Sequence, residues 1–106
     1  MADFESEVTC SDQDSGTTRV VAVRGHFDFS VHRSFREAYK DSQGIEQYLV
    51  DLRETIYIDS SALGMLLLLR EYAQGQGAAV VIRNASRDVR NILEIANFQK
   101  LFPIEG

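Results

Sequence analysis

Cysteine and proline are almost absent from this chain of 106 residues, which contains one of each. A single cysteine, Cys10, excludes an intramolecular disulfide framework and a structural zinc site built on cysteines, and a free thiol fits a reducing cytosol. One proline and seven glycines exclude a collagen-like or proline-rich linker chain. The length suits one domain spanning residues 1–106.

Positive charge is also scarce, since 11 Lys and Arg against 16 Asp and Glu give a net charge of −5. Without a basic cluster the chain lacks the electrostatic footprint that phosphate backbones require, so we expect no direct nucleic-acid partner. Residues 1–5 carry acids where a secretory signal carries basic and then apolar residues. The longest apolar run, residues 62–69, is far shorter than the ~20 residues of a membrane-spanning helix. We expect a cytoplasmic protein without membrane insertion.

Hydrophobic residues make up 44% of the chain, which predicts a packed core. Two alternating segments, residues 5–11 and 17–24, flank the polar cluster 12–16 and predict a β-hairpin. The second segment is continuously apolar over residues 20–23, so we expect it to be more buried than the first, which becomes an edge strand.

The remaining chain alternates between helical and strand patterns. We expect a helix capped by Ser30 and ending near Gly44, a central parallel strand at 48–52, and a helix from 59–61 to about Gln74. A strand at 79–83 and a helix capped by Ser86 follow. The apolar residues of the tail should pack back on the body; they are Phe98, Leu101, Phe102 and Ile104. The fold class is therefore α/β, an opening β-hairpin and then alternating helices and strands in a mixed, mostly parallel sheet covered by helices.

The common catalytic motifs are missing: there is no Gly-x-Ser-x-Gly, phosphate-binding loop, His-Glu-x-x-His or Gly-x-Gly-x-x-Gly. His26 and His32 lack a third metal ligand in the sequence pattern, so we expect structural or surface roles for them. The acids near the predicted turns are most simply solvated residues or helix caps; they are Asp28, Asp51, Glu54 and Asp59. We expect no catalytic residue, cofactor or metal.

The helix after residue 59 carries two apolar ridges. At 100° per residue one ridge belongs to the core, and the second starts from a hydroxyl at the helix N-terminus. The core ridge is Ala62, Leu66, Leu69 and Ala73, and the second is Ser61, Met65, Leu68 and Tyr72. In the simplest interpretation Ser60 and Ser61 cap the helix, and the second ridge packs under a loop.

The alternative interpretation is that one of these serines is phosphorylated. A phosphate at a helix N-terminus meets free backbone N–H groups and the positive end of the helix dipole, so the fold tolerates it. It also adds roughly −1.5 to −2 charge beside Asp59 and the apolar ridge, which opposes any partner that must desolvate that ridge. In this interpretation phosphorylation switches binding off.

Three segments resemble the anti-sigma factor antagonists of bacteria, which are STAS domains. Residues 58–64, Ile-Asp-Ser-Ser-Ala-Leu-Gly, follow the strand at 49–52 and resemble the family's signature. Residues 25–28, Gly-His-Phe-Asp, resemble its Gly-x-Leu-Asp loop, and residues 97–102 resemble its C-terminal segment. The resemblance covers essentially the whole chain. Ala62 stands where many members have Gly, and Phe27 where Leu is usual, so partner choice can differ in detail.

The resemblance implies a switch rather than an enzyme. The unmodified domain would bind an anti-sigma factor that is also a Ser kinase of the ATP-binding GHKL type, and so release a sigma factor or another downstream regulator. Phosphorylation of the second serine, here Ser61, would abolish binding, and a metal-dependent phosphatase of the PP2C type would reverse it. Residues 27–29 and 59–65 look most like a proteobacterial subgroup served by a multidomain response regulator with both activities, tied to motility and biofilm control.

Two other function classes stay open at this point. STAS domains also serve as subunits or appended domains of membrane transporters; the chain's start and end argue against an appendage, and its Ser pair favours phosphoregulation. A small-molecule enzyme has no motif behind it. If the domain is an anti-sigma factor antagonist, we predict a partner-binding surface formed by the following residues: Phe27, Asp28, Phe29, Asp59, Ser60, Ser61, Ala62, Gly64, Met65, Leu68 and Tyr72.

Overall fold

A six-stranded mixed sheet organises the molecule, which a computed structural model describes from residue 6 to residue 106. The acidic start at 1–5, and with it the first residue of the predicted hairpin, lies outside the described residues. The strands are β1 (Glu7–Gln13), β2 (Thr18–Phe27), β3 (Gln47–Asp51), β4 (Thr55–Ile58), β5 (Ala79–Arg83) and β6 (Ile104–Glu105). The α-helices are α1 (His32–Tyr39), α2 (Ser60–Gly75) and α3 (Arg87–Ile95), and short 3₁₀ turns occupy Asp14–Gly16, Phe29–Val31 and Phe98–Lys100.

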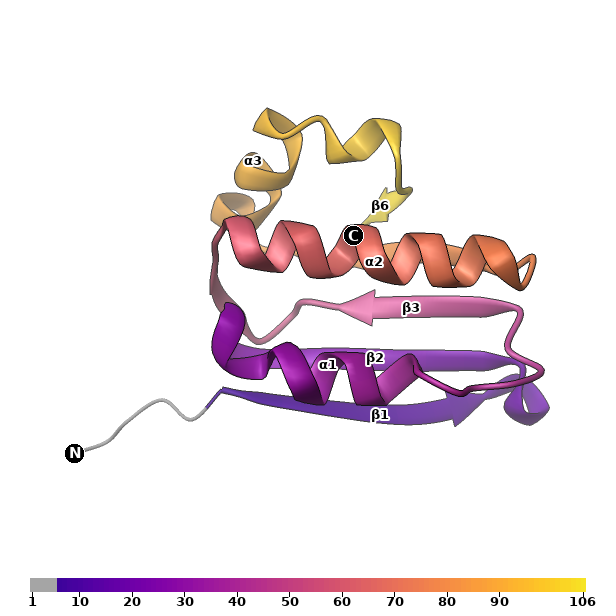
Figure 1. Cartoon of the computed structure of the whole chain (residues 1–106). Helices are drawn as coiled ribbons and strands as arrows, with labels where there is room; N and C mark the ends of the chain where they lie inside the picture. Colours follow the sequence, from indigo (N-terminus) through magenta and orange to yellow (C-terminus); the bar gives the residue numbers. More distant parts are fainter. Residues whose placement is uncertain (1–5) are drawn as a thin grey trace.

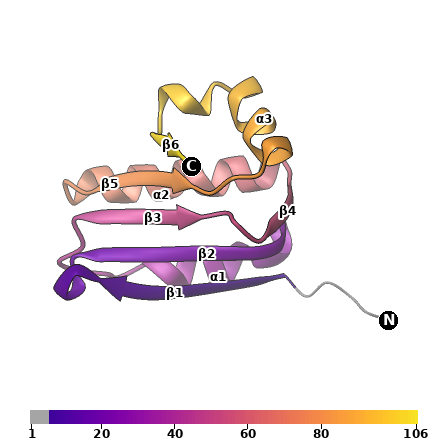
Figure 2. The same cartoon turned by 180° about the vertical axis from the view of Figure 1, so that it is seen from behind.

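The strand order is β1-β2-β3-β5-β6, and β4 pairs with the far end of β2. The hairpin pair β1 and β2 is antiparallel, whereas all the other pairs are parallel. This confirms the predicted class, with β1 at the edge and β3 in the centre. Figure 1 shows α1 and α2 lying over one face of the sheet, and from behind the strands lie in front of these two helices (Figure 2).

The core lies between this sheet face and the two helices. The predicted core ridge of α2 is fully buried, because each of its four residues has an exposed fraction of 0%: Ala62, Leu66, Leu69 and Ala73. Burying a leucine side chain contributes about 1.5–3 kcal/mol, so this ridge anchors α2 to the sheet. Phe98 and Phe102 also pack into the core, whereas Leu101 is 39% exposed, contrary to the prediction for the tail.

Strand β2 changes partner along its length. Its first half pairs with β3 and its second half with β4, and the register shifts between Gly25 and His26. Gly25 has φ = 85°, a value that L side chains rarely adopt, which explains a glycine at the shift. The resemblance of residues 25–28 to the Gly-x-Leu-Asp loop predicts a loop from Gly25; the strand instead continues to Phe27.

Two helix boundaries near α1 differ from the prediction. Ser30 is not a cap, because it lies inside the 3₁₀ turn, and Asp28 accepts its backbone N–H. The helix ends at Tyr39 rather than near Gly44, since Lys40 is extended and the Ser42 hydroxyl donates to the Tyr39 carbonyl at 2.6 Å. A serine that satisfies a terminal carbonyl stabilises an early end of the helix. The predicted cap of α3 is confirmed, because Ser86 accepts the Val89 N–H at 3.2 Å.

Candidate functional site

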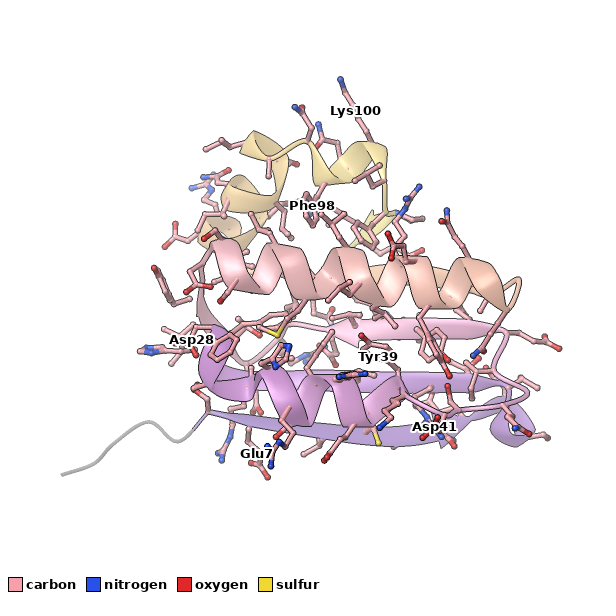
Figure 3. The ribbon with its side chains drawn as sticks, viewed as in Figure 1. Glu7, Asp28, Tyr39, Asp41, Phe98 and Lys100 are labelled. Carbon is pink, nitrogen blue, oxygen red and sulfur yellow. The ribbon has the colours of Figure 1, made fainter. Side chains whose placement is uncertain are left out.

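The candidate site lies at the carboxyl ends of β2 and β4. Phe27 and Ile58 are register partners in this parallel pair, and each is the last residue of its strand. The next residues are Asp28 and Asp59, so two carboxylates leave the same edge of the sheet as neighbours. Figure 3 shows Asp28 at the end of the molecule where α2 begins. Loops that follow strand ends of an open α/β sheet form binding sites at this kind of edge.

Asp59 caps α2 with a single oxygen. Its Oδ1 accepts the backbone N–H groups of Ser61 at 3.0 Å and Ala62 at 3.1 Å. The same oxygen accepts the Ser61 hydroxyl at 2.6 Å. The cap of this helix is therefore the aspartate, and the interpretation in which Ser60 or Ser61 caps it is wrong. The N–H groups of Ser61 and Ala62 are occupied by Asp59, so the expectation that a phosphate would meet them free is corrected as well.

Asp28 forms the same arrangement one strand away. Its Oδ1 accepts the Ser30 hydroxyl at 2.6 Å and the Ser30 N–H at 2.9 Å. These hydrogen bonds, the hydroxyl first, hold the pKa of Asp28 below its ordinary value. The carboxylate is therefore ionised at neutral pH. The edge carries two Asp-x-Ser turns of matching geometry, at 28–30 and 59–61.

The two serines of the α2 turn differ in environment. Ser61 is half-buried and tied to Asp59, whereas Ser60 is exposed at the first position of the helix. The Ser61 hydroxyl donates a hydrogen bond to the Asp59 carboxylate. The lone pairs of the serine oxygen therefore stay available to an electrophile that a partner delivers. This is the arrangement that a phosphoryl acceptor needs, because the nucleophile and a proton acceptor lie within hydrogen-bond distance.

Two members of the predicted surface point inward. Phe27 and Ala62 have exposed fractions of 0%, so their side chains are unavailable to a partner. Phe27 packs against Phe35 of α1 with ring centroids 5.1 Å apart. It shares the inner face of β2 with Val21 and Val23, because the strand runs further than the sequence suggested. These two residues shape the site from below.

The side chains of the second ridge of α2 differ in their exposure to solvent. Met65 is buried, Tyr72 is half-buried, and Leu68 is 52% exposed. Leu68 lies seven residues beyond Ser61, about 10 Å along the helix. The ridge thus leads from the serine turn along the outer side of α2, and its apolar member at the surface is Leu68.

Sequence reasoning missed two apolar side chains of β4 beside the site. Ile56 and Tyr57 are 52% and 49% exposed, and the Tyr57 ring meets the edge of His26 at 5.7 Å. A run of β-branched and aromatic residues at 56–58 was the available strand signal. Phe29 adds a third exposed apolar side chain: it is 69% exposed, and its ring stacks on His32 with the centroids 5.0 Å apart.

Two kinds of structural feature are absent from residues 6–106. Within that span no three His, Cys, Asp or Glu side chains gather into a group that could hold a metal ion. None of the described helices is both long and apolar enough to span a membrane.

Comparison with known proteins gives one family match and several similar structures. The family model described as "Mlab, STAS domain" matches residues 10–103. A STAS-domain containing protein of Pseudomonas aeruginosa is 45% identical over 98 residues, covering 92% of this chain and 97% of that protein.

Two solved structures share the fold at the same low identity of 14%. The anti-sigma factor antagonist SpoIIAA in its unphosphorylated form has a TM-score of 0.72 over 94% of this chain and 87% of its own. A sulfate transporter family protein from Wolinella succinogenes has a TM-score of 0.76 over 84% of this chain and 76% of its own. The fold is thus shared by proteins of two functional classes.

Proposed function

Because this chain belongs to the STAS domain family, we propose that it is an anti-sigma factor antagonist controlled by phosphorylation of Ser61. The unmodified domain binds an anti-sigma factor that is also a Ser kinase of GHKL type, and thereby releases a sigma factor or another downstream regulator. The observation that carries the proposal is the Ser61 hydroxyl, half-buried on the first turn of α2 and hydrogen-bonded to Asp59 at 2.6 Å.

Phosphoryl transfer from ATP to Ser61 requires few groups from this chain. The Ser61 oxygen attacks the γ-phosphorus of ATP held by the kinase, ADP leaves, and the hydroxyl proton passes to a base. Asp59 already accepts that proton in a hydrogen bond, so it orients the oxygen. The chain supplies the acceptor and the docking surface, while the partner supplies the catalytic machinery. A phosphatase of PP2C type, or a multidomain response regulator with both activities, hydrolyses the phosphoserine.

The hydrogen bonds of the turn support a switch. Phosphorylation removes the hydroxyl proton, so the bond from Ser61 to Asp59 is lost. The phosphate brings roughly −1.5 to −2 charge to an edge that already carries Asp59 and Asp28. A pair of unit charges 4 Å apart repels by about 1 kcal/mol even in water, and more where a partner excludes water. Either Asp59 releases the helix N-terminus or the phosphate projects outward into the partner's space.

Gly64 supports a docking role for the same turn. It is exposed within α2, and a methyl group added there would meet no atom within 4 Å, so the domain's own packing does not require a glycine. Glycine in a helix interior costs about 1 kcal/mol relative to alanine. A glycine that the fold does not need leaves a flat place where a partner can approach the backbone.

The second candidate is an adaptor subunit of a membrane transporter, because the sulfate transporter family protein shares this fold. That role needs a surface for a transporter subunit but no phosphoryl acceptor. At 14% identity the likeness to either class reflects the fold alone. The Ser61 turn therefore separates the two candidates.

The deciding experiment is phosphate transfer. The purified protein is incubated with ATP, Mg²⁺ and a lysate of the source bacterium, and peptides are searched for a gain of about 80 Da, the mass of HPO₃. We expect the gain on Ser61, with loss of labelling in Ser61→Ala. Absence of labelling, together with co-purification of a membrane transporter subunit, would favour the adaptor.

A further inference from the structure

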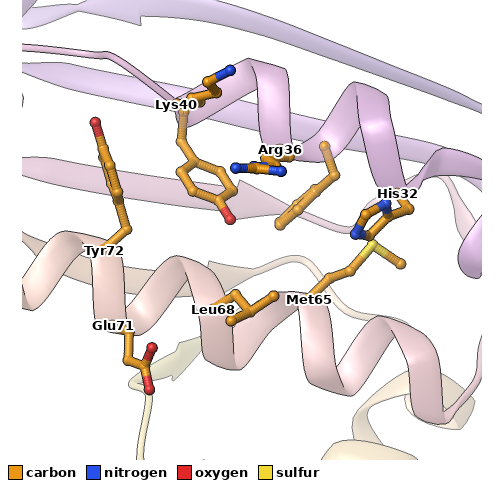
Figure 4. A pocket seen from close by; sticks show the side chains of 9 residues that line it. His32, Arg36, Lys40, Met65, Leu68, Glu71 and Tyr72 are labelled. Carbon is orange, nitrogen blue, oxygen red and sulfur yellow. The ribbon is translucent and has the colours of Figure 1, made fainter.

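A furrow separates α1 from α2 on the outer side of the helical layer. Its volume is about 430 Å³. Figure 4 shows His32 and Arg36 on α1, and Lys40 directly after it, on the opposite side of the furrow from Met65, Leu68 and Tyr72 of α2. The remaining lining residues are Phe35, Tyr39 and Glu71.

The floor of the furrow is apolar. Phe35, Tyr39 and Met65 are 1%, 6% and 4% exposed, so they form its base. The ring centroids of Tyr39 and Tyr72 lie 5.2 Å apart, and Figure 3 shows Tyr39 between the two helices. Leu68 stands on the α2 wall, half exposed. An apolar side chain inserted here would be enclosed by aromatic and thioether surface.

The α1 wall is positively charged. Arg36 and Lys40 are exposed and lie one helical turn apart, with His32 one turn earlier. The ion pairs found among residues 6–106 join Arg19 to Asp12, Arg24 to Glu7 and Arg90 to Glu94. Arg36 and Lys40 thus carry no ion pair within that span, although the whole chain has a net charge of −5. The furrow combines an apolar floor with cations on the α1 side that form no ion pair, and Glu71, the acid that lines it, lies on α2.

We propose that this furrow docks an amphipathic α-helix of a partner protein, with its acidic flank toward α1. Charge complementarity selects the occupant, since carboxylates at positions i and i+4 of a helix match the spacing of Arg36 and Lys40. Apolar anchors at i, i+3 or i+4, and i+7 reach the floor, as helices do in hydrophobic grooves. From His32 to Tyr39 α1 rises about 10 Å, which matches two turns of such a helix.

This contact goes beyond the Ser61 switch, because the α1 wall is not part of the partner-binding surface predicted for that switch, whereas Met65, Leu68 and Tyr72 belong to both. The α2 wall does continue the ridge that starts at Ser61. A partner bound at the turn can extend a helix along the furrow, and a second partner can use the furrow alone. Phosphorylation and helix docking are therefore separately measurable.

The test uses a phage library of helix-favouring peptides about four turns long, selected against the purified wild-type domain. We expect enriched peptides with the apolar spacing above and acidic residues along one flank. Their affinity is measured by fluorescence anisotropy. The double charge reversal Arg36→Glu with Lys40→Glu should weaken binding at least tenfold. Arg33→Glu is the matched control, since Arg33 is exposed on the same helix but does not line the furrow, and should change affinity less than twofold.

Several outcomes overturn the proposal. These are a selection that enriches no peptide, a selection that enriches basic peptides, or peptide affinity that is unchanged by Arg36→Glu with Lys40→Glu. Decanoate is titrated in parallel, and amide NMR shifts confined to the furrow with no enriched peptide would assign it to a small amphiphilic anion instead. Thermal midpoints verify that the variants fold, and Arg36→Ala with Lys40→Ala repeats the test without new charges. The peptide selection uses no kinase, so its result is independent of Ser61 labelling. Failure of the docking proposal can therefore be distinguished from failure of the proposed function.

Discussion

Asp28 and Asp59 directly follow Phe27 and Ile58, the register partners at the carboxyl ends of the paired strands β2 and β4. Each carboxylate holds the serine two residues later through a hydroxyl hydrogen bond of 2.6 Å. The edge is therefore acidic and ordered by its own side chains. Any negative charge added to either serine enters a region of like charge, which is the physical basis of the proposed switch.

The first prediction concerns which residue caps α2. Asp59→Ala should lower the free energy of unfolding by about 1 kcal/mol, because two backbone N–H groups lose their acceptor. In a domain of this size that corresponds to a fall of about 4–8 °C in the thermal midpoint. Chemical denaturation of the purified variants measures the change.

Ser60→Ala and Asp59→Asn are the controls. Ser60 is exposed and makes no cap hydrogen bond, and asparagine caps helices about as well as aspartate, so both should stay within about 0.5 kcal/mol of wild type. A loss in Ser60→Ala as large as that in Asp59→Ala would contradict the assignment.

Much of the fold could be predicted because local patterns agree with the long-range packing. The buried ridge of α2 follows from helical spacing, and the Ser86 cap from its position before an amphipathic segment. The strands β4 and β6 were missed because each has four residues or fewer and exists only by pairing with distant strands. Local sequence does not encode such pairing strongly.

The position of the turn at the candidate site could be predicted from the sequence, but the orientation of its side chains could not. The Asp-Ser-Ser pattern located the turn, but a short polar residue pattern does not say which side chain takes the N–H groups. Phe27 was placed on the surface because Gly25 predicts a loop. The structure instead uses this glycine to shift the register of β2, and the strand then turns Phe27 inward.

The second prediction is a pH dependence at Asp28. The Ser30 hydroxyl is the main cause of its lowered pKa, so Ser30→Ala should raise the pKa of Asp28 toward its ordinary value near 3.9. A lowered folded pKa stabilises the fold above the unfolded value, and this contribution is lost as the pH falls through the folded pKa. The difference in stability between the two proteins should therefore shrink as the pH falls below the ordinary pKa of an aspartate.

Carboxyl NMR titration measures the shift directly. Asp12, whose pKa is lowered by its hydrogen bond with Arg19, serves as the internal reference and should titrate identically in both proteins. An unchanged pKa of Asp28 in Ser30→Ala would show that the hydroxyl contributes nothing to it.

The third prediction maps the phosphate. Ser61 should be labelled and Ser30 should not, although both donate to an aspartate at 2.6 Å. Ser61 lies in the first turn of a 16-residue helix and begins its second ridge, whereas Ser30 lies in a three-residue turn. Ser60→Ala should label like wild type. Ser61→Asp should bind its partner more weakly than unmodified wild type, and less weakly than the phosphoprotein, since a carboxylate carries less charge than a phosphate. Label on Ser60 or Ser30 with Ser61 intact would refute the assignment.

The fourth prediction separates docking from folding at Leu68. This side chain is 52% exposed, so Leu68→Glu should leave the thermal midpoint nearly unchanged and slow the labelling of Ser61 at least tenfold. Leu69→Ala is the contrasting variant, because Leu69 is fully buried and its truncation should cost about 2–5 kcal/mol. A large fall in the midpoint of Leu68→Glu would place Leu68 in the core.

The fifth prediction uses the two glycines of α2. Gly64→Ala removes a flexible residue from the helix interior and places a methyl group in open space, so it should raise the free energy of unfolding by about 0.5–1 kcal/mol. If Gly64 is kept for close approach of a partner, the same methyl group should slow the labelling of Ser61 by the lysate. Stability and function would then move in opposite directions.

Gly75 provides the matched control, since it ends the same helix and an added methyl group there also meets no atom within 4 Å. Gly75→Ala should not lower stability, and it should label at the wild-type rate because it lies 14 residues from Ser61, about 20 Å along the helix. Equal labelling rates for Gly64→Ala, Gly75→Ala and wild type would mean that no partner approaches Gly64 closely. The docking surface would then have to lie on the side of Asp28 and Phe29.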